Sequence, residues 1–169
     1  LNIEKTVNSS FLKFNGLLHT LGLSPLKSQK FTIKIEVDTN PPNGGVAAET
    51  TYLKTFVFSI RHHDLASLYA GKLCACFFRK YSKGRDLYDF IWFFGKGIKP
   101  NFTLLNNGAA QVQGELPGIN EKNLKGFMTR YIENVDFAAA RKDVSRFLED
   151  RDELKLFDPK LLKGAIEAF

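Results

Sequence analysis

The segment from His63 to Arg79 constrains the fold more than any other part of the chain, because apolar residues occur nearly all round it. A segment of this kind is typical of a helix that is buried on most of its sides. Asp64 can cap its N-terminus, and we expect the helix to run to about Tyr81. The chain has 169 residues, which is enough for one domain with a real core around such a helix.

Lys72 lies in the middle of an apolar stripe of this helix. At about 100° per residue, four apolar residues fall within about 60° of it, namely Leu65, Leu68, Tyr69 and Cys76. Arg79 is almost in line with Lys72, two turns on. A buried ammonium group needs a partner or a function. Three interpretations stay open: the side chain reaches water, pairs with a carboxylate, or lines a cleft and binds an anionic phosphate.

The next helix, expected from Arg85 to Phe94, places Asp86 and Asp89 one turn apart on one face. Acidic residues in a first turn complement the helix dipole, and Arg85 with Asp89 is an ordinary helical ion pair. The pattern alone therefore favours a structural role for these residues. We expect Trp92 to be part of the core.

The rest of the chain predicts a small sheet followed by a helical half. Residues 4–21 have helical spacing, whereas Phe31–Val37 alternates and is typical of a strand with one buried face; Tyr52–Ile60 is a second strand. Residues 95–118 are expected to form a loop with at most one short element. Three helices follow, at about residues 120–134, 136–149 and 159–169.

The expected fold class is α+β, in which a small β-sheet precedes a C-terminal helical half. We divide the chain into an α/β portion, residues 1–62, and a helical portion, residues 63–169, that together form one compact unit. The net charge of +6 fits a polyanionic partner such as a nucleotide or RNA, although many soluble proteins carry it. No apolar run is long enough to span a bilayer, and two unpaired cysteines indicate a reduced, cytoplasmic setting.

Three motifs in order along the chain carry a family resemblance. They are Phe31-Thr-Ile-Lys-Ile-Glu-Val-Asp-Thr-Asn-Pro-Pro, Leu68-Tyr-Ala-Gly-Lys-Leu-Cys-Ala and Gly84-Arg-Asp-Leu-Tyr-Asp. Together they resemble the AbiEii toxin family of nucleotidyltransferases, within the polymerase-β-like nucleotidyltransferase superfamily. Proteins of this family act in abortive phage infection and in type IV toxin–antitoxin systems. The small sheet is then the remnant of a nucleotidyltransferase sheet.

The resemblance implies an enzyme that transfers a nucleoside monophosphate from an NTP to an acceptor, with tRNA or another RNA as candidate acceptors and a cognate antitoxin as a partner. It assigns catalytic roles to Glu36, Lys72 and Asp86, with Asp89 in support. Glu36 is the carboxylate for Mg²⁺ or Mn²⁺, and Lys72 contacts the nucleotide phosphates together with Arg79 and Arg85. Nucleotidyl transfer needs carboxylates for the metal and cations for the triphosphate.

The sequence also departs from the family pattern. A Gly-Gly-Thr or Gly-Ser motif and an Asp-x-Asp pair should precede the Lys-x-Glu strand, but Gly44-Gly45 follows it and no Asp-x-Asp comes before Glu36. We therefore expect an N-terminally incomplete chain that is inactive alone and binds metal and NTP only with the preceding segment. The alternatives are an RNA- or protein-binding module on a degenerate transferase fold, and a structural helical domain. The last would show a tight, dry ion pair of Lys72 with Asp86 or Asp89 and no cleft beside Glu36.

Overall fold

The computed structural model describes residues 7–81 and 83–168 and divides the chain into two compact units, Leu1–Pro41 and Pro42–Phe169. The α+β class is confirmed, but the strands form two separate two-stranded sheets instead of one. The division after Pro41 differs from the boundary expected at residue 62, because the second pair of strands belongs with the helices.

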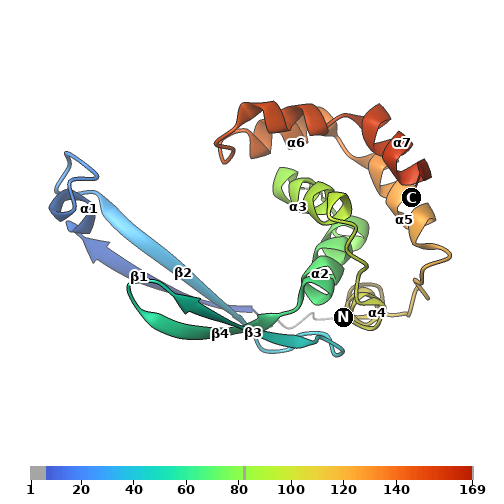
Figure 1. The fold of residues 1–169 in the computed structure, drawn as a ribbon, viewed down its shortest axis with the longest axis horizontal. Coiled ribbons are helices and arrows are strands. Elements are labelled where there is room, and N and C mark those ends of the chain that lie inside the picture. Colours follow the sequence, from blue (N-terminus) through green and yellow to red (C-terminus); the bar gives the residue numbers. More distant parts are fainter. Residues whose placement is uncertain (1–6, 82, 169) are drawn as a thin grey trace. The chain divides into compact units, whose positions relative to one another are not determined.

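The first unit is a β-hairpin. Strand β1 (Val7–Asn15) pairs antiparallel with β2 (Lys30–Asp38), and the short helix α1 (Leu17–Thr20) lies in the connection between them (Figure 1). The register places Leu12 opposite Ile33 and Phe14 opposite Phe31, whose ring centroids are 6.1 Å apart. The predicted strand at 31–37 is confirmed.

The helix predicted over residues 4–21 is wrong for residues 7–15, which form β1, and of the described residues 7–21 only Leu17–Thr20 are helical. The spacing of Phe11, Phe14 and Leu18 suits a helix, but Leu12 and Phe14 also alternate and match the apolar face of β2. Such cross-strand pairs stabilise a sheet and override a weak helix preference. Gly16 then adopts φ +70, a left-handed conformation that ends the strand.

The apolar face of this hairpin is exposed, so the prediction of a buried face is also wrong. Phe31, Ile33 and Ile35 retain between 39% and 44% of their accessible surface, and Val37 retains 56%. No apolar side chain among the described residues 7–41 is buried. Two strands alone provide no second layer to cover such a face.

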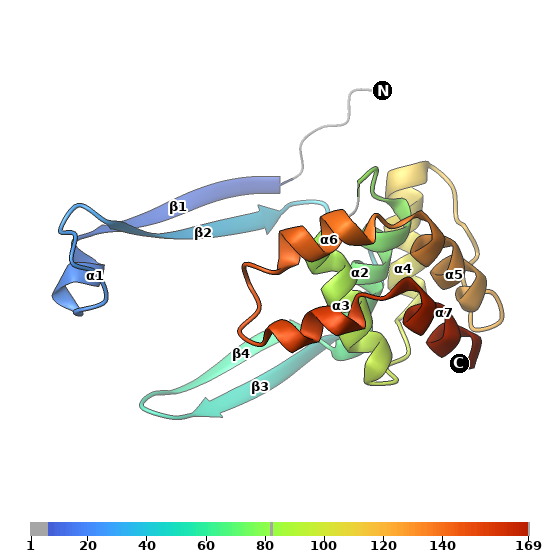
Figure 2. The ribbon, with the colours of Figure 1, turned by 90° about the horizontal axis from the view of Figure 1, so that it is seen from above.

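The second unit begins with another hairpin, β3 (Ala47–Leu53) and β4 (Val57–His63). The single strand predicted at 52–60 is therefore two half-strands that flank the turn at residues 54–56, where Tyr52 stacks on Phe58. Figures 1 and 2 both show this hairpin extending away from the helices of the same unit.

Helices form the rest of the second unit. Their bounds are α2 Leu65–Phe78, α3 Gly84–Gly95, α4 Phe102–Gln113, α5 Leu124–Asn134, α6 Phe137–Val144, the 3₁₀ helix η1 Arg151–Leu156, and α7 Pro159–Ala168. Helix α2 packs on α3 and α4, α3 packs on α6, and α5 packs on α7. Fully buried side chains define one core at these contacts: Tyr69, Leu73, Leu87, Phe90, Leu105, Met128, Ile132, Phe157 and Ile166.

Helix α2 begins as predicted, because the Asp64 carboxylate accepts a hydrogen bond from the Ser67 amide at 2.8 Å. It ends at Phe78, three residues before the expected end. Helix α4 was not predicted, since Asn and Gly lower its helix propensity. Asn101 caps it by accepting from the Leu104 amide at 3.1 Å, and Gly108 lets it approach α2 at Cys74.

A set of hydrogen bonds holds the loop before β3 against the N-terminal end of α2. Asn101 Nδ2 donates to the Gly44 carbonyl at 2.7 Å and to Ser67 Oγ at 3.1 Å, and Ser67 Oγ accepts from the Val46 amide at 3.0 Å. Gly44 has φ +99, a conformation that other residues rarely adopt. The loop expected between the strands is thereby held against α2 and α4.

Candidate functional site

A cleft of about 630 Å³ opens where the end of α2 and the start of α3 meet α6 and η1. Five residues singled out from the sequence line it: Lys72, Arg79, Arg85, Asp86 and Asp89. Helices α2 and α3 pack together antiparallel, so residues of both helices line one wall of the cleft. Glu36, the sixth, belongs to the other unit.

Lys72 pairs with Asp89 across the α2–α3 seam, with Nζ 2.6 Å from Oδ2. Both side chains remain open to solvent, at 42% and 31% of their accessible surface. Lys72 thus pairs with a carboxylate and also reaches solvent, which are two of the three interpretations left open by the apolar stripe, and the pair is not the dry one expected of a purely structural domain. A solvent-exposed pair adds little to stability, so Lys72 can exchange Asp89 for another anion at low cost.

Arg79, two turns after Lys72, pairs with Asp86, one turn before Asp89. The Asp86 side chain is only 10% exposed, and its backbone carbonyl accepts a 3.5 Å contact from the buried Cys76 thiol. Burial raises the pKa of Cys76 to about 12, so this thiol stays protonated. An arginine beside a nearly buried carboxylate is a fixed structural pair, unlike Lys72 with Asp89.

The opposite wall of the cleft comes from the end of α6, from η1 and from the segment that joins them. Phe147 lies under the Arg85 guanidinium, 5.8 Å from its ring centroid. The Tyr88 hydroxyl is hydrogen bonded to the Glu153 carboxylate, which raises the pKa of Tyr88. Glu149 is a further acid of this wall. Sequence reasoning missed these residues because they join the site only through packing of distant helices.

The charges of the cleft balance. Its basic residues are Lys72, Arg79, Lys83 and Arg85, and its acidic residues are Asp86, Asp89, Glu149 and Glu153. Lys72 is paired with Asp89 and Arg79 with Asp86, so an anionic ligand reaches either of these two cations by taking it over from its acid. The exposed Lys72 is the side chain best placed for such an exchange.

Glu36 projects from β2, where the Lys34 ammonium lies 2.6 Å from its Oε1 and Ser9 Oγ lies 3.4 Å away. Its side chain is 53% exposed. Among residues 7–81 and 83–168, no three His, Cys, Asp or Glu side chains are grouped so that they could hold a metal ion. The described residues thus do not by themselves fit the two-metal site that the resemblance implies.

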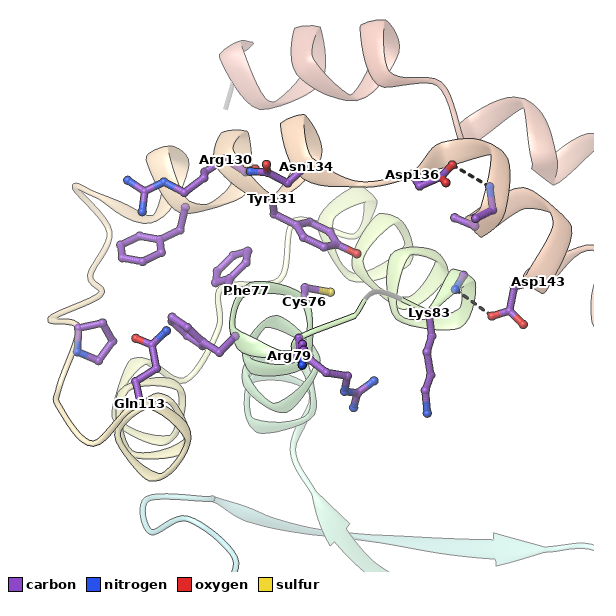
Figure 3. A pocket seen from close by; sticks show the side chains of 17 residues that line it. Cys76, Phe77, Arg79, Lys83, Gln113, Arg130, Tyr131, Asn134, Asp136 and Asp143 are labelled. Atoms are coloured by element: carbon purple, nitrogen blue, oxygen red, sulfur yellow. Dashed lines mark hydrogen bonds between the residues drawn. The ribbon is translucent and has the colours of Figure 1, made fainter. Parts of the chain in front are cut away.

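A second cavity, of about 900 Å³, adjoins the cleft (Figure 3). Arg79 and Lys83 line both cavities, and Figure 3 shows their side chains extending to the same side. Phe77 and Tyr131 are among its aromatic lining residues, and Arg130, on α5 next to Tyr131, lines it as well. Its two acids are already engaged, because Asp136 accepts from the Ala139 amide and Asp143 from the Gly84 amide. No sequence pattern indicated this cavity.

Comparison with known protein families identifies the relationship. The family model described as nucleotidyl transferase AbiEii toxin, type IV TA system, matches residues 3–161. The chain belongs to the AbiEii family. Searches of curated proteins and of solved structures gave no match.

AbiEii membership confirms the resemblance read from the three motifs and places the chain among nucleotidyltransferase toxins that are accompanied by an antitoxin. The match extends well beyond the three motifs, from Phe31 to Asp89, that carried the resemblance. None of the described helices is long and apolar enough to cross a membrane. The individual roles of Glu36, Lys72, Arg79, Arg85, Asp86 and Asp89 stay predictions.

Proposed function

We propose that this AbiEii chain serves Mg²⁺- or Mn²⁺-dependent transfer of a nucleoside monophosphate from an NTP to an RNA acceptor, with tRNA as the first acceptor to test. The observation that supports it is the cleft itself. The predicted phosphate-binding residues Lys72, Arg79 and Arg85 line one wall together with Asp86 and Asp89.

In this proposal Lys72 is the residue that contacts the triphosphate. Its ammonium leaves the exposed Asp89 carboxylate, 2.6 Å away, and binds a phosphate oxygen instead. Asp86 keeps Arg79 in place throughout, because the Asp86 carboxylate is only 10% exposed and would be costly to leave without its partner. Asp86 is thus a positioning residue.

The metal requires carboxylates that these residues do not gather in one place. We propose that Glu36 contributes one of them, and no Asp-x-Asp pair precedes it in this sequence. Transfer of label from each NTP in the presence of Mg²⁺ or Mn²⁺ tests the activity.

Calorimetric titration with an NTP tests the binding. Lys72→Ala should weaken binding about tenfold or more, because a charge-assisted hydrogen bond contributes roughly 1.5–3 kcal/mol. Lys160→Ala, which removes an exposed lysine of α7, is the matched control and should leave the affinity unchanged. Equal affinities of the two variants would contradict the proposal.

The alternative is a non-catalytic module that binds RNA or a protein. The cavity of Figure 3 favours RNA, since Arg79, Lys83 and Arg130 lie beside the aromatic Phe77 and Tyr131. Under this alternative, Arg130→Ala weakens binding of a single-stranded RNA while Lys72→Ala does not, and NTP does not compete.

A further inference from the structure

We propose that Trp92 is the platform on which the base of the bound nucleotide stacks. This inference rests on the proposed function, and it assigns a residue that sequence reasoning placed in the core. Trp92 is 42% exposed, in contrast to its neighbour Phe93 at 7%. An exposed indole at the end of a ligand cleft is suited to stacking on a planar ring.

The antiparallel register of α2 and α3 places Trp92 next to the cleft. Three contacts define the register: Arg79 with Asp86, Lys72 with Asp89, and the ring of Tyr69 with that of Phe93, whose centroids are 5.0 Å apart. Residue numbers fall along α2 as they rise along α3. One turn beyond the Lys72–Asp89 pair in this direction are Leu68, four residues before Lys72, and Trp92, three residues after Asp89.

Helix geometry puts Trp92 on the same stripe of α3 as the charged residues of the cleft. At about 100° per residue, Arg85, Asp89 and Trp92 lie within about 60° of one another. Trp92 lies one turn beyond Tyr88 and Asp89, the last α3 residues that line the cleft. Arg85 and Trp92 are about 10 Å apart along the helix axis, at about 1.5 Å per residue.

The facing stripe of α2 has the same character. Leu65, Leu68 and Lys72 lie within about 60° of one another, and the two leucines are 50% and 40% exposed. The seam thus has an apolar end, with Leu65, Leu68 and Trp92, and a charged end, with Lys72 and Asp89. Isolated exposed apolar residues are common on proteins, but three that continue a charged cleft form a patch.

A nucleotide matches this arrangement of a charged end beside an apolar end. Its phosphates carry the charge that Lys72 can accept, and its base is a planar ring that stacks on an aromatic side chain. The indole ring of Trp92 meets the ring of Phe93 edge-on, with centroids 4.9 Å apart, and this contact supports it. Lys96 Nζ lies 5.7 Å from the indole centroid and covers it from one side. The base takes the open side.

The test uses the fact that Trp92 is the only tryptophan of the chain. Excited selectively, its emission should be quenched saturably by NTP and not by inorganic triphosphate, which occupies the charged end alone. Before ligand is added, acrylamide should quench the emission readily. Strong protection from acrylamide would show that another surface covers Trp92 and would overturn the inference.

Calorimetry on variants completes the test. Trp92→Ala should weaken NTP binding about tenfold and leave triphosphate binding unchanged, while Trp92→Phe, which keeps a planar ring, should retain most of the affinity. Leu161→Ala, another exposed apolar residue at 51% exposure, is the control for general surface effects. Circular dichroism establishes that each variant is folded.

The outcomes separate this inference from the proposed function. If NTP binding depends on Lys72 but not on Trp92, the assignment of Trp92 as the stacking residue is wrong and the proposed function stands. If NTP does not bind, or binds without regard to Lys72, the proposed function fails and the platform fails with it.

Discussion

Substitution of Gly84 by alanine should destabilise the second unit strongly. Gly84 is the buried first residue of α3, and its amide donates to Asp143 at 3.0 Å. A Cβ there would overlap the Ala140 carbonyl oxygen and lie 3.1 Å from both the Ala140 carbonyl carbon and the Val144 nitrogen. All three atoms are backbone of α6, so the whole helix must shift and no side chain can rotate away.

We expect a loss of about 2 kcal/mol in the free energy of unfolding, within the range for overpacking a close contact. Gly71 provides the matched control, because a Cβ there meets nothing within 4 Å. Alanine at Gly71, in the middle of α2, should stabilise by about 0.5–1 kcal/mol through its better helix propensity.

Denaturant unfolding followed by Trp92 fluorescence measures both effects, since the only tryptophan reports on the unit that contains α3 and α6. The two alanine variants should move the midpoint in opposite directions. If Gly84→Ala is as stable as the parent chain, then α3 and α6 do not approach as closely as described, and the α6 wall of the cleft is misplaced.

Two further predictions concern α2. Asp64→Ala should lower stability by about 1 kcal/mol, the usual effect of losing an N-cap. The Ser67 hydrogen bonds lower the pKa of Asp64, so its contribution is present above the carboxyl's ordinary pKa and is lost as pH falls through the lowered value. Denaturation of both proteins at several acidic pH values should show the difference shrinking; a constant difference would refute the assignment. Burial raises the pKa of both thiols, to about 12 for Cys76, so a thiol reagent at pH 8 should modify the half-buried Cys74 first, and faster reaction of Cys76 would contradict its burial.

Local signals in the sequence predicted the structure well where local physics decides it. Asp64 before an apolar run gave the start of α2, and the alternation after Phe31 gave β2. Residues 7–15 were misassigned because their partner strand lies beyond the intervening α1 and its turn. Helix α4 was missed because Asn and Gly masked it, although Asn101 and the pattern of Leu104, Leu105 and Ala109 were a usable signal.

The same distinction applies to the candidate site. Lys72, Asp86 and Asp89 were found from spacing on two neighbouring helices, and the structure places them in one cleft. Their exposure was not predictable, because it depends on which faces the later helices cover. Glu153 and Trp92 were outside the reach of pattern reasoning for the same reason.

The wall shared by the two cavities has a consequence for mutational studies. Arg79 and Lys83 line both cavities, so the effect of a substitution at either position cannot be assigned to one cavity alone. Lys72 touches only the cleft, and Arg130 touches only the cavity of Figure 3. Measurements of NTP binding and of RNA binding should therefore separate Lys72→Ala from Arg130→Ala, whereas Arg79→Ala should affect both.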